Sequence, residues 1–294
     1  MSKPKRHHYV PRWYLEGFTD DTGFVHVYDR GRKLWRRERP HQVMIINNYY
    51  RQEWAPAGVD VNVLEKMFGT LVEPKGCESF NKLLKRGHLD TNDFAAMLTY
   101  LEFQRIRVPR QAKMAFAIAK NALNQHLPDE VARAVLRGEV RITIKDSVRF
   151  EMMRIVAGKI TPWLIRMNWL IHEAAPGSSF ITNDSPVCFY HGHFPPPTEP
   201  GIALAGTMIV FPLDSRRLLL MAHPEAGKEG INPSTPLPSS APAGEGPSIV
   251  DGGPLASEQV QHYNNVVLRL SDHLIVGNSK EVLEHCLGET IKGH

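Results

Sequence analysis

The segment His7-His8-Tyr9-Val10-Pro11-Arg12-Trp13-Tyr14-Leu15-Glu16-Gly17-Phe18 opens the chain with two histidines, a proline and a dense run of large apolar side chains. Residues near a terminus are usually polar and poorly ordered. A segment this apolar leaves water only by packing against other parts of the protein. We therefore expect it to dock on the body of the fold and to hold both histidines in fixed positions.

The pattern beyond this segment changes twice along the chain. Residues 24–29 and 34–37 alternate in polarity around a turn at 30–33, which predicts a β-hairpin. From about residue 60 the apolar residues recur at helical spacing, with Pro74 and Gly76 expected to interrupt one helix. Short apolar stretches bounded by turn formers return beyond Pro162.

These patterns predict an α+β fold in which β-rich N- and C-terminal parts form one mixed body. A helical block, at about 60–158, is inserted between them. We expect one domain over 1–294, divided into an N-terminal segment with the hairpin (1–58), the helical block (59–158) and a β-rich part (159–294). Within the last part, 224–256 is rich in Pro and Gly and predicts a long loop.

Composition restricts the class of protein. No apolar run approaches the roughly 18 to 20 residues that span a bilayer, and the basic N-terminus lacks the apolar stretch of a secretion signal. Three scattered cysteines indicate reduced thiols, so we expect a cytoplasmic protein without membrane association. The chain has no phosphate-binding glycine motif and no GxSxG setting, which argues against familiar nucleotide binding and a serine hydrolase.

The basic excess lies in one region. Residues 1–39 hold ten Lys or Arg against five Asp or Glu, whereas the remaining residues hold 25 basic and 26 acidic side chains. Such a patch attracts phosphates or another polyanion, so its hairpin side chains are candidate nucleic-acid contacts. They are Arg30, Arg32, Lys33, Arg36 and Arg37. The alternative is a solvated hairpin whose charges serve solubility alone.

The adjacent His7 and His8 point to opposite sides of an extended segment, so at most one of them enters a given pocket. Imidazole serves as a base, an acid or a metal ligand near neutral pH. The structural alternative is a histidine packed beside Tyr9 that donates a hydrogen bond to a carbonyl group.

Two further polar positions interrupt apolar surroundings. Asp184 ends an apolar strand, either closing a turn on its own backbone or offering a general base or metal ligand. Arg105 shares the apolar helix face of Leu98 and Leu101, so it needs a partner, for which Glu102, Glu65 and Glu73 are candidates. A buried ion pair and an anion-binding role remain open for Arg105.

The quoted motifs resemble a bacterial family known as domain of unknown function number 4238. Its members open with His-Tyr-Val-Pro-x-x-Tyr-Leu-x-x-Phe, as His8–Phe18 does, and carry Thr-x-Asp-x-Pro, as Thr182–Pro186 does. The resemblance continues through Tyr28-Asp29, Gln104-Arg105 and Phe211–Leu213 to Asn264, for which an inward hydrogen bond is the default interpretation. The resemblance implies a mobile-genome or defence-associated protein and no established chemistry.

These candidates together predict a composite site in which His7 or His8, Arg105 and Asp184 approach one another. If it is catalytic, we expect a metal-dependent hydrolase or nuclease acting on nucleic acid. His8 and Asp184 would act as a general base or as ligands of a divalent ion such as Mg²⁺ or Mn²⁺. Arg105 would stabilise the negative charge of the phosphate. The alternative is a non-catalytic binding module for nucleic acid or another anionic partner. Substrate, metal and oligomeric state stay open.

Overall fold

The computed structural model describes residues 6–53, 55–238 and 249–292, and within them the two ends of the chain share one sheet. The predicted hairpin is confirmed as β2 (Val25–Asp29) and β3 (Leu34–Glu38). β2 also pairs with β11 (Leu274–Gly277), which pairs with β6 (Thr182–Asn183), all antiparallel. The N- and C-terminal β-rich parts are therefore one mixed body, as predicted.

Two other sheets complete the β structure of the described residues. β1 (Arg6–His8) pairs antiparallel with β4 (Ile45–Asn47). A five-stranded sheet has the order β10-β5-β9-β8-β7, antiparallel except where β10 runs parallel to β5. Its strands are β5 (Asn168–Ala174), β7 (Cys188–Tyr190), β8 (Met208–Pro212), β9 (Arg217–Ala222) and β10 (Ile249–Leu255).

The predicted loop at 224–256 is wrong over its last residues, because 249–255 form β10; residues 239–248 lie outside the described part. The sequence pattern did not predict this strand, because it contains Gly252, Gly253 and Pro254. β10 is an edge strand with a register shift between Asp251 and Gly253, and edge strands tolerate both bulges and proline. A Cβ on Gly252 would stand 2.4 Å from the His172 ring, so glycine is required there.

The helical block is confirmed between the two β-rich parts. Its α-helices are α2 (Val63–Met67), α3 (Glu73–Leu84), α4 (Thr91–Ile106), α5 (Pro109–His126), α6 (Asp129–Leu136), α7 (Ser147–Val156) and α8 (Thr161–Leu164). The expected interruption at Pro74 and Gly76 is wrong, since a π-helical turn, Phe68–Val72, joins α2 to α3. Pro74 lies in the first turn of α3, directly after the π-helical turn. Gly76 permits close packing, because a Cβ there would stand 2.8 Å from Tyr100 Cβ.

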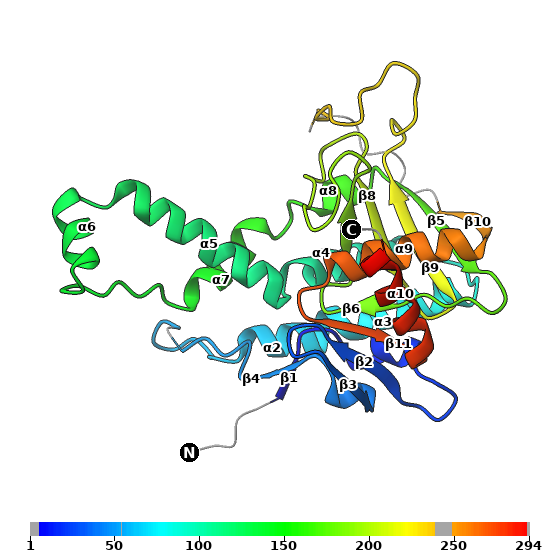
Figure 1. Cartoon of the computed structure of the whole chain (residues 1–294), viewed down its shortest axis with the longest axis horizontal. Helices are drawn as coiled ribbons and strands as arrows, with labels where there is room; N and C mark the ends of the chain where they lie inside the picture. Colours follow the sequence, from blue (N-terminus) through cyan, green and yellow to red (C-terminus); the bar gives the residue numbers. More distant parts are fainter. Residues whose placement is uncertain (1–5, 54, 239–248, 293–294) are drawn as a thin grey trace.

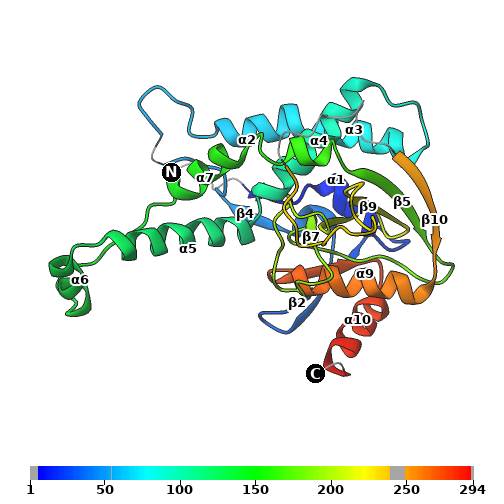
Figure 2. The ribbon, with the colours of Figure 1, turned by 90° about the horizontal axis from the view of Figure 1, so that it is seen from above.

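Part of this block projects from the body. The distal half of α5, all of α6 and the chain leading to α7 form an arm that extends away from the sheets in both views (Figure 1, Figure 2). Ala115 is the buried residue of α5, and α6 has none. The base of the arm, where α5 and α7 meet α4, therefore joins the arm to the core.

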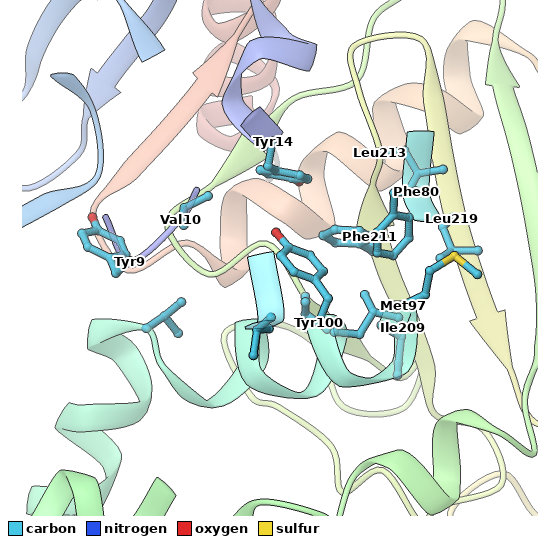
Figure 3. Close-up of a cluster of buried hydrophobic side chains, with 14 of the residues drawn as sticks. Tyr9, Val10, Tyr14, Phe80, Met97, Tyr100, Ile209, Phe211, Leu213 and Leu219 are labelled. Carbon is cyan, nitrogen blue, oxygen red and sulfur yellow. The ribbon is translucent and has the colours of Figure 1, made fainter. Parts of the chain in front are cut away.

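The opening segment docks on the body of the fold, as predicted, and it contacts the C-terminal β-rich part. Tyr14, from α1 (Arg12–Leu15), stacks on Phe211 of β8 with ring centroids 5.3 Å apart (Figure 3). Its hydroxyl donates to the Pro212 carbonyl at 2.7 Å and lies 2.8 Å from the Thr182 hydroxyl. This buried contact links the beginning of the chain to two sheets at once.

Two helices complete the C-terminal part, α9 (Ser257–Leu270) and α10 (Lys280–Lys292). The apolar face of α9 packs with residues of β6, β7 and β8 in a second core cluster. None of the described helices combines the length and the apolar character that a membrane crossing requires.

Candidate functional site

His7 and His8 point to opposite sides of β1, as predicted, and meet different environments. His7 is buried, its Nδ1 accepts the Tyr50 N–H at 2.9 Å, and its Nε2 lies 2.5 Å from Glu65 Oε2. The half-buried His8 lies near the His41 backbone, and burial, opposed by the Glu73 charge, lowers the pKa of its imidazole. His7 thus joins β1 to α2. Of the two imidazoles, that of His8 is the more accessible to solvent.

Asp184 is buried and binds a distant turn. Its carboxylate accepts the backbone N–H groups of Asp272, His273 and Leu274 at 2.7 to 2.8 Å. Burial raises the pKa of this carboxyl, and the three N–H groups act in the opposite direction. The expected turn on its own backbone belongs instead to Asn183, whose Oδ1 accepts the Ser185 N–H at 2.7 Å.

Asp184 also lines an open polar pocket of about 620 Å³ between the hairpin and the start of α5. Its charged lining is balanced, with Arg32, Arg36 and Lys113 facing Asp29, Asp184 and Asp272. Tyr9 contributes a buried ring, and burial raises the pKa of its hydroxyl well above the ordinary value. The pocket brings together residues of three sequence motifs without an excess of either charge.

Arg105 forms a buried ion pair, but none of the three predicted carboxylates is its partner. Its guanidinium binds both carboxylate oxygens of Glu199 and lies 4.3 Å from the centre of the Phe189 ring. The predicted partners serve elsewhere: Glu102 accepts from Ile160 and Thr161, Glu65 contacts His7, and Glu73 accepts from Arg107 at 2.7 Å. The sequence offered no signal for Glu199, which lies in a Pro-rich loop far along the chain.

Arg105 is one of three buried arginines that line a single pocket of about 170 Å³ at the base of the arm. The others are Arg107, at the end of α4, and Arg149, in α7. We call this the arginine pocket; Tyr49, Gln111 and Phe189 complete its polar and aromatic wall. None of the described residues that line it is acidic, and the carboxylates that pair with the three arginines lie outside the lining.

Each arginine donates hydrogen bonds to acceptors within the protein. Arg107 donates to Glu73 and to the Gln104 side-chain oxygen, and its guanidinium lies 5.1 Å from the Phe68 ring centre. Arg149 donates from Nε to Asp146 at 2.8 Å and from Nη2 to the Tyr49 carbonyl. Arg149 Nη1 is shielded from solvent and has no hydrogen-bond partner among the described residues. Arg149, which carries this unpartnered donor, is one of the residues that line the arginine pocket.

The remaining side chains that line the arginine pocket are apolar, and we call them the apolar wall. Helix α7 supplies three of its residues, and α4, α5 and the residue before α8 supply the others. The residues are Ile106, Ala112, Met114, Met152, Met153, Val156 and Ile160. Arg149, Met153 and Val156 follow i, i+4, i+7 spacing, so they share one face of α7. This spacing is the sequence signal that could have placed Arg149 beside Met153 and Val156.

The hairpin cations are largely engaged within the protein. Arg30 donates to the Leu268 carbonyl and the Ser271 hydroxyl, and the exposed Arg32 lies 3.9 Å from Asp29. Arg36 pairs with Glu38 at 3.2 Å and Arg37 with Asp20 at 2.7 Å. Lys33 is exposed in the turn. Most of the basic excess thus has an internal acceptor.

A comparison with protein-family models finds a match over residues 6–281 to a family described as "Protein of unknown function (DUF4238)". The chain belongs to this family. No curated protein and no solved structure matches. The DUF4238 match includes every candidate discussed above, the arginine pocket among them.

Within this DUF4238 chain, the remaining candidates are structural links. Asn264 Oδ1 accepts the Ile181 N–H at 3.0 Å and its Nδ2 donates to the Ser179 carbonyl at 2.9 Å, which is the predicted inward hydrogen bond.

The described residues contain no group of three His, Cys, Asp or Glu side chains suited to a metal ion. Arg105 and Asp184 line different pockets, and neither pocket includes His7 or His8.

Proposed function

We propose that this protein binds a small anion in the arginine pocket, as a binding module and not as a hydrolase. The observation that carries the proposal is Arg149 Nη1, a buried cationic donor without a hydrogen-bond partner among the described residues. Leaving a buried donor unpaired costs about 1 to 3 kcal/mol of folding free energy, and a charged donor costs more. A bound anion would supply the missing acceptor.

Three features of the arginine pocket support this proposal. Its lining contains three guanidinium groups and no described acidic side chain. The pocket is partly withdrawn from water, where electrostatic attraction is stronger than at a surface. Glu199, Glu73 and Asp146 hold the arginines in position before a ligand arrives, so little conformational entropy remains to be lost on binding.

The test is calorimetry and thermal unfolding of the full chain with phosphate, sulfate, acetate and hexanoate at constant ionic strength. We expect saturable binding of at least one anion and a higher Tm, because a ligand of the folded state stabilises it. Arg149→Met should weaken binding about 10- to 100-fold, the range for a charged hydrogen bond. Arg154→Met is the matched control, since Arg154 lies in the same helix, is exposed and pairs with Glu151.

Should Arg149→Met fail to fold, Ala112→Leu provides a second variant, because Ala112 lines the pocket and a larger side chain occupies the ligand volume. Loss of binding in that variant, with its fold retained, supports the site. Absence of binding by every anion, or equal affinity in Arg149→Met and Arg154→Met, overturns the proposal.

The metal-dependent hydrolase or nuclease stays a prediction, with a cytoplasmic location and a role in defence. It is tested by incubating the protein with DNA and RNA in Mg²⁺ or Mn²⁺. Cleavage that is lost in His8→Ala and in Asp184→Ala, with both variants still folded, would favour the hydrolase over the binding module. For nucleic-acid binding, Arg36→Ala with Arg37→Ala is the test. The proposal expects unchanged affinity and salt dependence, since both side chains already pair internally.

A further inference from the structure

Resting on the proposed function, we infer that the ligand of the arginine pocket is a small carboxylic acid with an apolar chain or ring. The pocket has two chemically different walls. Guanidinium groups form one wall, and aliphatic and thioether side chains form the other, among them Met152, Met153 and Val156. A ligand that satisfies both walls carries its charge at one end and an apolar group at the other.

The size of the pocket limits the ligand. Its volume is about 170 Å³, whereas an apolar protein cavity of about 150 Å³ holds a benzene molecule. The space therefore suits a head group with an apolar part of about four to six carbons. A nucleoside phosphate is too large, and inorganic phosphate or acetate leaves the apolar wall without a contact.

The free donor capacity favours a carboxylate over a phosphate dianion. Arg105 already binds both oxygens of Glu199, and Arg107 binds Glu73 and Gln104. Arg149 uses Nε and Nη2 internally, which leaves Nη1. A carboxylate has two acceptor oxygens, whereas phosphate brings more acceptors and more charge that the site would have to satisfy.

The apolar wall permits some variation in ligand shape. Met114, Met152 and Met153 are unbranched and flexible, and such side chains adapt to ligands of different outline. Met114 is 46% exposed, so it stands at the edge of the pocket where solvent begins. We place the apolar end of the ligand against the α7 wall, with Met114 covering its far side.

The experiment measures Kd by calorimetry for acetate, butyrate, hexanoate, benzoate and dodecanoate, with phosphate and hexanol for comparison. Affinity should rise about fourfold per methylene from acetate to hexanoate, the factor expected for burial of a CH₂ group. Dodecanoate exceeds the volume and should bind less tightly than hexanoate. Hexanol lacks the charge and should bind at least about tenfold more weakly than hexanoate.

Two variants locate the ligand. Met153→Ser should flatten the dependence on chain length and leave acetate binding nearly unchanged, since it alters the apolar wall alone. Ile155→Ser is the matched control, because Ile155 lies in the same helix but is exposed and outside the pocket lining. Arg149→Met should remove the preference for hexanoate over hexanol.

The outcomes separate the two proposals. If phosphate or acetate binds at the site as tightly as hexanoate, the assignment of an apolar acid fails and the anion-binding function stands. If hexanol equals hexanoate, or if none of the anions binds, the proposed function and the ligand class both fail.

Discussion

The turn that binds Asp184 and the arginine pocket place buried charged groups in opposite situations. The Asp184 carboxylate accepts three backbone N–H groups, so the fold itself satisfies it. Arg149 is equally buried, yet its Nη1 lacks a hydrogen-bond partner among the described residues. A buried charge that is fully satisfied by its own chain holds a fold together, whereas one with a free donor is suited to an external ligand. Motif membership alone does not distinguish the two cases.

The largest expected effect comes from Asp184→Ala. The change leaves three backbone N–H groups without their acceptor, and it should lower the free energy of unfolding by about 4 kcal/mol. Urea unfolding measures the effect, with the exposed Asp21→Ala as control. A loss no larger than that of the control would show that the three hydrogen bonds of Asp184 do not stabilise the fold. The contrast between Asp184 and Arg149 would then be wrong.

A smaller effect is expected from Glu199→Gln in the arginine pocket. The amide retains an acceptor but removes the charge that faces Arg105 and Arg110, so the free energy of unfolding should fall by about 2 to 3 kcal/mol. It also removes a charge that competes with the ligand for Arg105, and because the amide oxygen still holds that side chain in position, anion binding should tighten. Urea unfolding with and without hexanoate tests both statements, with the exposed Glu151→Gln as control. Weaker anion binding in Glu199→Gln would contradict the assigned role of the pocket.

The smallest expected effect is the pH dependence due to His8. Burial lowers the pKa of this imidazole below its ordinary value of 6.5, so the unfolded chain takes up the proton more readily than the folded one. This contribution to stability is complete above the unfolded pKa and declines as the pH falls from there toward the lower folded pKa. His8→Gln should make the unfolding free energy less sensitive to pH in that window. An unchanged slope, or an equal change in the exposed His88→Gln, would argue against a desolvated His8.

Local sequence patterns anticipated much of the architecture. The alternation around residues 30–33 predicts the hairpin, and the helical spacing after residue 60 predicts the inserted block. They failed at Pro74, where a π-helical turn carries the helix onward, and at Gly252, where an edge strand replaces the expected loop. In both places, packing between distant segments outweighed a local preference for a break.

The candidate site was only partly predictable. That Arg105 is buried and paired follows from its place on an apolar helix face, because a charge there requires a counterion. Its partner does not follow, since several carboxylates satisfy the same rule. Arg107 and Arg149 come together with Arg105 only because α4 and α7 pack at the base of the arm.

The sequence alone determined the α+β order of elements, the docking of the opening segment and the opposite orientation of His7 and His8. These properties depend on periodicity and apolar density among near neighbours, which the chain carries locally. The tertiary structure decided which acceptors satisfy Asp184, which carboxylate pairs with Arg105 and where a free guanidinium donor remains. Such contacts join residues far apart in the chain, so their identity depends on how whole helices and strands pack against one another.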